Sequence, residues 1–258
     1  MVWQRNVVIK NSHEIDIMRT AGRINAEALK AVQEAIAPGV PTAQLDAIAE
    51  DIIRSNGAIP TFKGYPGPYP FPATLTISIN EELVHGIPSK DRRLKSGDIV
   101  SIDCGTTYKG FVGDSAVTVG VGKISKQAQH LLDVTEEVLY IGIEMMLKGN
   151  RVGDVSHAIQ NHVENHGYHV PREYSGHGVG RQMHEAPQVP NYGRAGRGMM
   201  LRPGVTIALE PMVLIGTHRT RVLPDQWTVI SEDGSLTAHF EHSVAVTNGD
   251  PEILTMLA

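Results

Sequence analysis

The order of turns and apolar segments in the first half of the chain recurs in the second half. This repeat limits the fold more than any other feature of the sequence. Two breaks in the first half, Pro38-Gly39 and Asn56-Gly57, align with Lys148-Gly149 and His166-Gly167 after a displacement of 110 positions. Glycine at such positions is typical of helix ends. Each half is therefore predicted to contain two helices that are separated by one glycine-containing break and followed by another, as expected of a duplicated unit.

Two further alignments extend the repeat into predicted strands. Segment 94–103 aligns with 201–210 after a displacement of 107 positions, and 114–119 aligns with 241–246 after one of 127. Each alignment places an acidic residue of the first half on an acidic residue of the second. Chance similarity of amphipathic segments explains one such match, but three in the same order favour an ancient duplication.

Residue periodicity predicts that both halves contribute helices and strands. No change of composition marks a linker, so residues 1–258 are expected to form a single domain with halves at about 12–122 and 125–248. Ser12 and Thr42 are expected to cap the first two helices. The expected elements of the first half are helices at 12–37 and 42–55, an aromatic proline-rich loop at 60–72, and strands at 75–79, 84–87, 98–102 and 117–121.

Composition excludes several classes of protein. With 258 residues and 41% hydrophobic side chains, the chain can bury a sizeable core without disulfides. The balance of 23 basic and 28 acidic residues provides no broad cationic surface for nucleic acid. A single cysteine, no signal-like N-terminus, and apolar runs far shorter than the roughly 18 residues of a membrane span predict a cytoplasmic protein of a reducing compartment.

Asp103 and Asp114 flank a turn-like stretch between two apolar runs. In a hairpin centred between Tyr108 and Lys109 they would lie opposite each other on one face, with Cβ atoms about 5 Å apart. Such a pair raises the pKa of at least one carboxyl unless a cation is bound. Two exposed acids at a hairpin mouth would be the simpler explanation if the pair stood alone.

The repeat adds Glu210 and Glu241 at the corresponding positions of the second half. Four carboxylates on one sheet need about +4 of charge to stay ionised together. His177 lies between glycines that let a ligand approach closely, so it is predicted to be a metal ligand or a proton donor. Two divalent cations about 3.5 to 4 Å apart would match this set. Cys104 follows Asp103 and therefore faces the other side of its strand, which argues against a thiolate zinc site.

The residues that carry this chemistry occur in segments that resemble those of the type I methionine aminopeptidases. The resemblance extends over about residues 12–248. It rests on the motifs at 80–88, 103–114, 176–180, 184–187, 209–212 and 240–243. It implies a duplicated pita-bread fold of the α+β class, with an antiparallel sheet flanked by helices, pseudo-two-fold halves and a single catalytic domain. It also implies the metal ligands, which are Asp103, Asp114, His177, Glu210 and Glu241.

The same resemblance implies an activity, namely removal of the initiator methionine from nascent proteins, with preference for a small second residue. Glu210 is then the expected general base, which takes a proton from water and passes it to the leaving amine. His184 is expected to donate to the substrate carbonyl oxygen and His85 to act on the side of the scissile amide nitrogen. Both histidines therefore count as catalytic and as substrate-binding residues.

A pocket for methionine requires an apolar slot, and four residues are candidates: Tyr65, Phe71, Met183 and Trp227. The sequence departs from the family pattern at Met183, where relatives commonly have phenylalanine, and at Thr76, where many have cysteine. The stretch Pro66–Pro72 is also longer than usual. These departures affect the shape of the pocket rather than the reaction.

Most of the remaining histidines are interpreted as ordinary surface or packing residues, including those between 157 and 169. His242 should face away from Glu241 because it is the next residue of a strand, whereas His239 should share the face of Glu241. Relatives commonly carry glutamine at the position of His239, so it is expected near the ligands rather than among them.

Several alternatives and partners follow from the residues. A mixed carboxylate and imidazole site accepts Co, Mn, Fe or Zn. The expected partners are methionyl peptides and nascent chains, with transient contact to the ribosome, a monomeric state, and neither specific nucleic-acid binding nor a membrane. A prolidase or aminopeptidase P is the alternative within the same chemistry. A silent peptide-binding module, which would lack metal ligands, is the alternative outside it.

Overall fold

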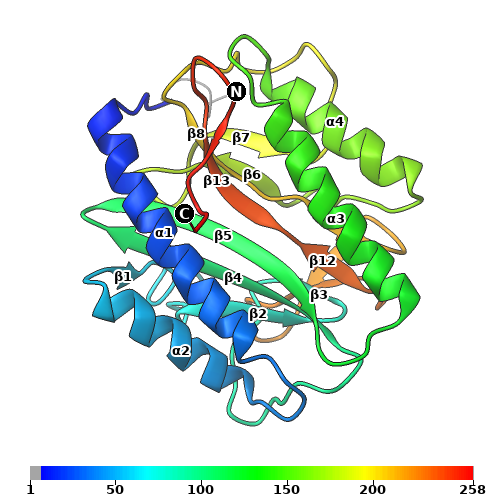
Figure 1. The fold of residues 1–258 in the computed structure, drawn as a ribbon. Coiled ribbons are helices and arrows are strands. Elements are labelled where there is room, and N and C mark those ends of the chain that lie inside the picture. The colour runs from blue at the N-terminus through cyan, green and yellow to red at the C-terminus, as the bar shows by residue number, and fades with distance from the viewer. Residues whose placement is uncertain (1–6, 258) are drawn as a thin grey trace.

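A computed structural model describes residues 7–257. Figure 1 shows the helices on one side of a large, twisted sheet. The helices are α1 (Ser12–Glu34), α2 (Thr42–Ser55), α3 (Lys126–Glu144) and α4 (Val152–Asn165). The strands are β1 (Ile59–Pro60), β2 (Leu75–Ile79), β3 (Glu82–Val84), β4 (Ile99–Tyr108), β5 (Phe111–Gly120), β6 (Ser175–Gly178), β7 (Glu185–Pro190), β8 (Thr206–Leu209), β9 (Met212–Leu214), β10 (Thr220–Val222), β11 (Val229–Ser231), β12 (Thr237–His239), β13 (Glu241–Ala245) and β14 (Glu252–Ile253).

The main sheet joins strands from both halves of the chain. Its order is β1-β4-β5-β13-β8-β6-β7, with β2 paired to β4 and β14 paired to β13. All of the pairs in this sheet are antiparallel. The pair β5–β13, with Glu241 opposite Ala116, connects the two halves. Helices α1 and α2 pack on the first half and α3 and α4 on the second, and each pair covers its own apolar core.

The repeat predicted from the sequence is visible in the backbone hydrogen bonds. Gly39 N–H donates to Leu94 O at 2.7 Å, and the aligned Gly149 N–H donates to Leu201 O at 3.0 Å. Both glycines have a left-handed backbone, with φ of 91° and 96°. Only glycine adopts this conformation at little cost, so both helix pairs turn at a glycine. The expected α+β class, with its antiparallel sheet, flanking helices and pseudo-two-fold halves, is confirmed by these pairings.

The expected helix caps are wrong by one residue. Asn11, rather than Ser12, caps α1, because its side chain accepts from Glu14 N–H while the Glu14 carboxylate accepts from Asn11 N–H. Pro41, which has no capping side chain, precedes α2. The Thr42 hydroxyl instead donates to Ser89 O at 3.1 Å.

The β4–β5 hairpin differs from its predicted register. Its turn is centred between Lys109 and Gly110, so Asp103 lies opposite Ala116 and Asp114 lies opposite Gly105. Lys109 and Gly110 have φ of 45° and 78°. Two positive φ values are what a type I′ turn requires, and the glycine makes this centre the less strained one. Because the register moves by two residues, Asp103 and Asp114 remain on the same face, as predicted.

The strands that carry the acids are also longer than expected. The predicted strands 98–102 and 117–121 become β4 and β5, each of ten residues. The apolar alternation that marks a strand is interrupted where polar residues face the side of the sheet opposite the helices. The predicted strand 84–87 ends at Val84, because His85 has a left-handed backbone with φ of 61°. Within residues 7–257, no helix has the length and apolar character required to cross a membrane.

Candidate metal centre and active site

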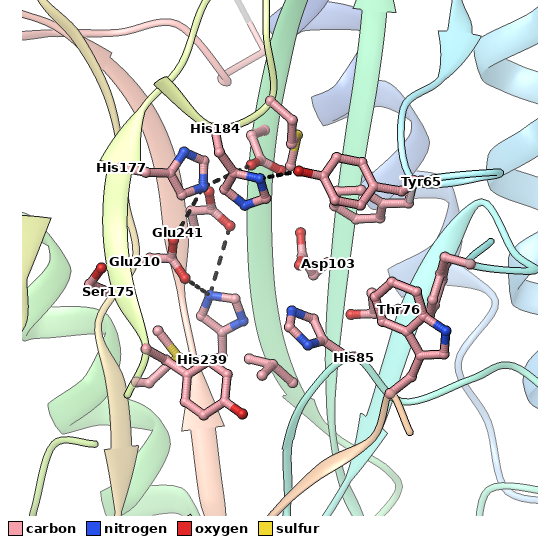
Figure 2. A pocket seen from close by; sticks show the side chains of 18 of the residues that line it. Tyr65, Thr76, His85, Asp103, Ser175, His177, His184, Glu210, His239 and Glu241 are labelled. Atoms are coloured by element: carbon pink, nitrogen blue, oxygen red, sulfur yellow. Dashed lines mark hydrogen bonds and ion pairs between the residues drawn. The ribbon is translucent and has the colours of Figure 1, made fainter. Parts of the chain in front are cut away.

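The five predicted ligands come from five neighbouring strands and meet on the face of the sheet opposite the helices. Asp103 lies on β4, Asp114 on β5, Glu241 on β13 and His177 on β6, and Glu210 directly follows β8. The structure therefore brings all five together, although the chain separates the first from the last by more than half its length. Figure 2 shows His177, Glu210 and Glu241 on one side of the cavity and Asp103 on the other.

Small side chains separate the ligands along the sheet. Ala116 lies between Asp103 and Glu241, because it is opposite Asp103 on β4 and opposite Glu241 on β13. In the next row, Ala208 pairs with both Ser243 and His177. These small residues leave space above the strands, into which the longer acidic side chains can turn.

The ligand atoms converge at distances that suit a bound cation. His177 Nε2 lies 3.4 Å from Glu210 Oε1 and 3.8 Å from Asp114 Oδ2. One ligand atom from each of Asp114, His177 and Glu241 lies within 4.8 Å of the others. His177 Nδ1 is 3.0 Å from Gly178 O, and donation to that carbonyl leaves Nε2 as the lone-pair nitrogen that faces the carboxylates.

The electrostatics of the acids are unfavourable without a cation. Burial raises the pKa of Asp114 to about 7, and the side-chain hydrogen bond to Glu241 lowers it only in part. Burial and then neighbouring carboxylates raise the pKa values of Asp103, Glu210 and Glu241 well above their usual range. Burial and then His184 lower the pKa of His177 to about 3, so its imidazole is neutral and able to ligate.

Three buried carboxylate oxygens lack a hydrogen-bond partner, namely Asp103 Oδ1, Asp114 Oδ1 and Glu241 Oε1. A buried polar atom without a partner is costly and needs an explanation. Oxygen and imidazole donors that converge in this way are the ligands that first-row divalent metals accept. The residues therefore fit the metal that their chemistry implies.

A cavity of about 250 Å³ opens beside the acids. The four residues predicted to form the apolar slot, Tyr65, Phe71, Met183 and Trp227, all line it. The Phe71 and Trp227 rings meet edge to face with centroids 5.2 Å apart. Such contacts give a rigid apolar wall next to the ligands.

Sequence reasoning missed six other lining residues, namely Phe62, Val84, Glu173, Tyr174, Ser175 and Met212. Phe62 belongs to the predicted aromatic loop at 60–72, and Met212 belongs to the motif at 209–212. Both therefore lie in segments that the sequence had already indicated. Tyr174 carried no signal of its own. Thr76, singled out as a departure from the family pattern, is opposite Asp103 and lines the cavity.

His85 and His184 both face this cavity. Tyr65 Oη lies 2.6 Å from His184 Nδ1. If the phenol donates, the His184 proton is on Nε2. The His85 ring lies between Tyr174 and Trp227, with centroids at 6.1 and 6.3 Å. Burial and then His184 lower the pKa of His85 to about 4, and burial also lowers that of His184.

His239 lies closer to the acids than the sequence suggested. Its Nε2 is 3.8 Å from Glu210 Oε2 and 3.7 Å from Glu241 Oε2, and that nitrogen has no hydrogen-bond partner. Burial lowers its pKa to about 3. His242 faces the helix side as predicted, where its Nδ1 is 2.8 Å from Thr255 Oγ1. Cys104 is buried in the core beneath α1 and α2.

The histidines of α4 lie outside the cavity. His157 Nε2 is 3.0 Å from the Asn161 amide, and His162 Nε2 is 3.3 Å from Glu137 on α3. The His162 and His166 rings pack with centroids 4.5 Å apart. These contacts match the surface and packing roles expected of them.

Comparison with known proteins connects this site to a family. The sequence profile of Metallopeptidase family M24 matches residues 16–248. A methionine aminopeptidase of Clostridium acetobutylicum is 51% identical over 250 residues, with 97% of this chain and 99% of the relative covered. Methionine aminopeptidase 1 of Bacillus subtilis is 49% identical, with 96% and 99% covered.

Solved structures show the same similarity. The crystal structure of a methionine aminopeptidase from Thermotoga maritima superimposes with a TM-score of 0.95 at 45% identity and covers 98% of this chain and 100% of that chain. A prolidase from Pyrococcus furiosus has a TM-score of 0.78 at 24% identity, with 100% of this chain and 68% of that chain covered. The second likeness shows a shared fold only.

Proposed function

This chain belongs to metallopeptidase family M24 and is an aminopeptidase that acts on N-terminal methionine, and we propose that it removes the initiator methionine of nascent proteins. We further propose a preference for a small second residue. The observation that supports the reaction is the convergence of one imidazole and four carboxylates, two buried and two partly buried, beside an aromatic slot. The slot is apolar enough for a thioether side chain.

We infer that the site holds two divalent cations, with Co, Mn, Fe and Zn as candidates. The proposed ligands are Asp103, Asp114, His177, Glu210 and Glu241. Four negative charges match two divalent ions, and the three unpartnered oxygens are available for them. A bound pair of this kind lowers the pKa of a water molecule and polarises a carbonyl group.

Glu210 is the proposed general base. Its Oε1 faces His177 and its Oε2 faces His239, so the carboxylate lies between two neutral imidazoles. Burial and the nearby acids raise its pKa, which helps it to accept a proton from water. Glu210 then delivers that proton to the leaving amine, so that the peptide bond breaks with no net change at the carboxylate.

His184 and His85 are the proposed donors to the substrate. The Tyr65 hydroxyl at His184 Nδ1 favours the tautomer whose Nε2–H points into the cavity, where it can donate to the scissile carbonyl oxygen. His85 acts on the side of the amide nitrogen. Its left-handed backbone is a strained conformation of the kind found at functional sites.

The slot next to these groups is proposed to select methionine. Phe71 and Met183 are buried, and Trp227 closes one wall. We also propose that the protein works in the cytoplasm as a monomer on nascent chains, with transient contact to the ribosome.

Peptide assays test the proposal. With Mn(II) or Co(II) present, the protein should release methionine from Met-Ala-Ser and leave Ala-Pro-Ala intact. Proline-directed cleavage would favour a prolidase or aminopeptidase P. No cleavage and no bound metal would favour a silent binding module.

Histidine variants test the assigned roles. His85→Ala and His184→Ala should lower kcat while metal content, measured by elemental analysis, equals that of the wild type. Asp114→Asn is the contrasting variant and should lose metal. Unchanged turnover in both histidine variants would remove them from the mechanism.

A further inference from the structure

A nearly buried ion pair lies directly behind the active-site loop and outside the site described above. Lys10 Nζ is 2.6 Å from Glu185 Oε2, and the two side chains are only 2% and 8% exposed. Glu185 is the residue after His184, whereas Lys10 belongs to the segment before α1. The pair therefore joins the N-terminal segment to the loop that carries a proposed catalytic histidine.

That loop, residues 180–184, contains bends but no regular structure and connects β6 to β7. The β6–β7 ladder also changes register between His177 and Gly178, so strand pairing does not continue smoothly into the loop. His184 lies at the end of the loop, and its ring has one side-chain hydrogen-bond partner in the described structure, Tyr65. Val112 N–H donates to Gly180 O at 2.8 Å and holds the start of the loop, whereas the end of the loop that carries His184 depends on other contacts.

The ion pair supplies two fixed points. Lys10 is anchored to the sheet side by its own N–H, which donates to Gly204 O at 2.8 Å. On the loop side, the second carboxylate oxygen of Glu185 accepts from Gln182 N–H at 3.1 Å. Gly180 packs against the pair so closely that an added Cβ would lie 2.7 Å from Lys10 Nζ and 2.8 Å from Glu185 Oε1.

We propose that Lys10 and Glu185 are positioning residues that hold His184 in its catalytic place beside His177, from which its ring centroid is 4.3 Å away. This inference rests on the proposed role of His184 in the reaction. A buried ion pair gives little net stability compared with apolar packing, but it fixes geometry strongly. Neither residue lines the cavity, so both act through the loop.

Lys10→Met tests the proposal with a side chain of similar length. A misplacement of about 1 Å can cost about 100-fold in rate. Turnover of Met-Ala-Ser should therefore fall by about 10- to 100-fold, with KM changed less than about threefold and metal content equal to that of the wild type. Arg19→Met is the control. Arg19 Nη2 also ties the N-terminal region to the rest of the fold, through Glu252 Oε2 at 3.0 Å. Arg19 belongs to α1, on the helix side of the sheet and away from the site, so kcat should not change.

A double-mutant cycle separates positioning from general destabilisation. If Lys10 acts through His184, Lys10→Met should lower kcat in the wild-type background but have no further effect in the His184→Ala background. Equal losses in both backgrounds would overturn the proposal. So would a wild-type kcat in Lys10→Met.

The double variant Lys10→Met/Glu185→Gln is the control for loss of folding. It leaves no unpaired buried charge and keeps an acceptor for Gln182 N–H. It should melt close to the wild type yet keep the loss of kcat, and recovery of kcat along with stability would contradict a positioning role. Failure of the proposed function gives a different result. In that case the wild type releases no methionine, or His184→Ala turns over normally.

Discussion

Removing the metals should make the stability of this protein strongly dependent on pH, and Asp114 allows the effect to be calculated. Its side chain is only 3% exposed, and burial raises its pKa from 3.8 to about 7. The folded state therefore binds this proton more tightly than the unfolded state does. Stability that is present at low pH is lost as pH rises from about 4 to about 7.

The size of the effect follows from the two pKa values. A carboxyl whose pKa moves from 3.8 to about 7 costs about 4 kcal/mol once pH exceeds both values. Buried histidines oppose this trend at lower pH. The pKa values of His177 and His239 fall from 6.5 to about 3. Their contribution to the free energy of unfolding therefore rises with pH between about 3 and 6.5. The two opposite trends overlap between about pH 4 and 6.5, so the effect of Asp114 must be read from a comparison in which the histidine contributions cancel.

A comparison of the wild type with Asp114→Asn isolates the carboxyl. Metal-free protein is prepared with a chelator, and its free energy of unfolding is measured by urea denaturation at several pH values. Asp114→Asn should be similar to the wild type near pH 4 and more stable by up to about 4 kcal/mol at pH 8. Asp51→Asn, which removes an exposed carboxylate of α2, should show no such trend.

Adding Mn(II) or Co(II) should reverse the order, because a ligand that binds only the folded state stabilises it by mass action. The wild type should then be the more stable protein at pH 8. The reasoning is refuted if the advantage of metal-free Asp114→Asn does not grow between pH 5 and pH 8. A wild type that gains no stability from either metal would refute the link to the cations.

Three other changes test the walls of the site. Tyr65→Phe removes the hydroxyl at His184 Nδ1 and should lower kcat about tenfold with little change in KM, which steady-state kinetics would show. Trp227→Ala opens the slot beside Phe71 and should raise KM for methionyl peptides by about 10- to 200-fold. A fall in kcat with an unchanged KM would argue against a binding role. The Cys104 thiol is fully buried and its pKa is raised by burial, so iodoacetamide should label it only after denaturation; labelling of the native protein would contradict its place in the core.

Much of the fold could be predicted because its signals are local. The glycine stops, the amphipathic helices and the repeated acidic positions depend on spacings of a few residues. The hairpin register shows the limit of such reasoning. Asp103 and Asp114 were placed on one face correctly, but the turn centre depended on whether Lys109 could take a left-handed backbone beside Gly110.

The candidate ligands could be named from the sequence, but their distances could not. Asp114 and Glu241 come together because β5 of the first half pairs with β13 of the second, and that pairing joins strands 127 residues apart in the alignment. His239 shows the same limit, since alternation placed it on the face of Glu241 but could not place Nε2 3.7 Å from the carboxylate.

The sequence by itself determined that this chain has two related halves, a set of acids on equivalent strands, and a histidine among glycines, because periodicity and repetition are local properties of the chain. Only the tertiary structure decided which atoms meet. The cavity walls at Phe62 and Tyr174 and the ion pair between Lys10 and Glu185 join segments that share no spacing in the sequence. Such contacts depend on how the sheet and its loops pack, and that packing is decided by the whole chain at once.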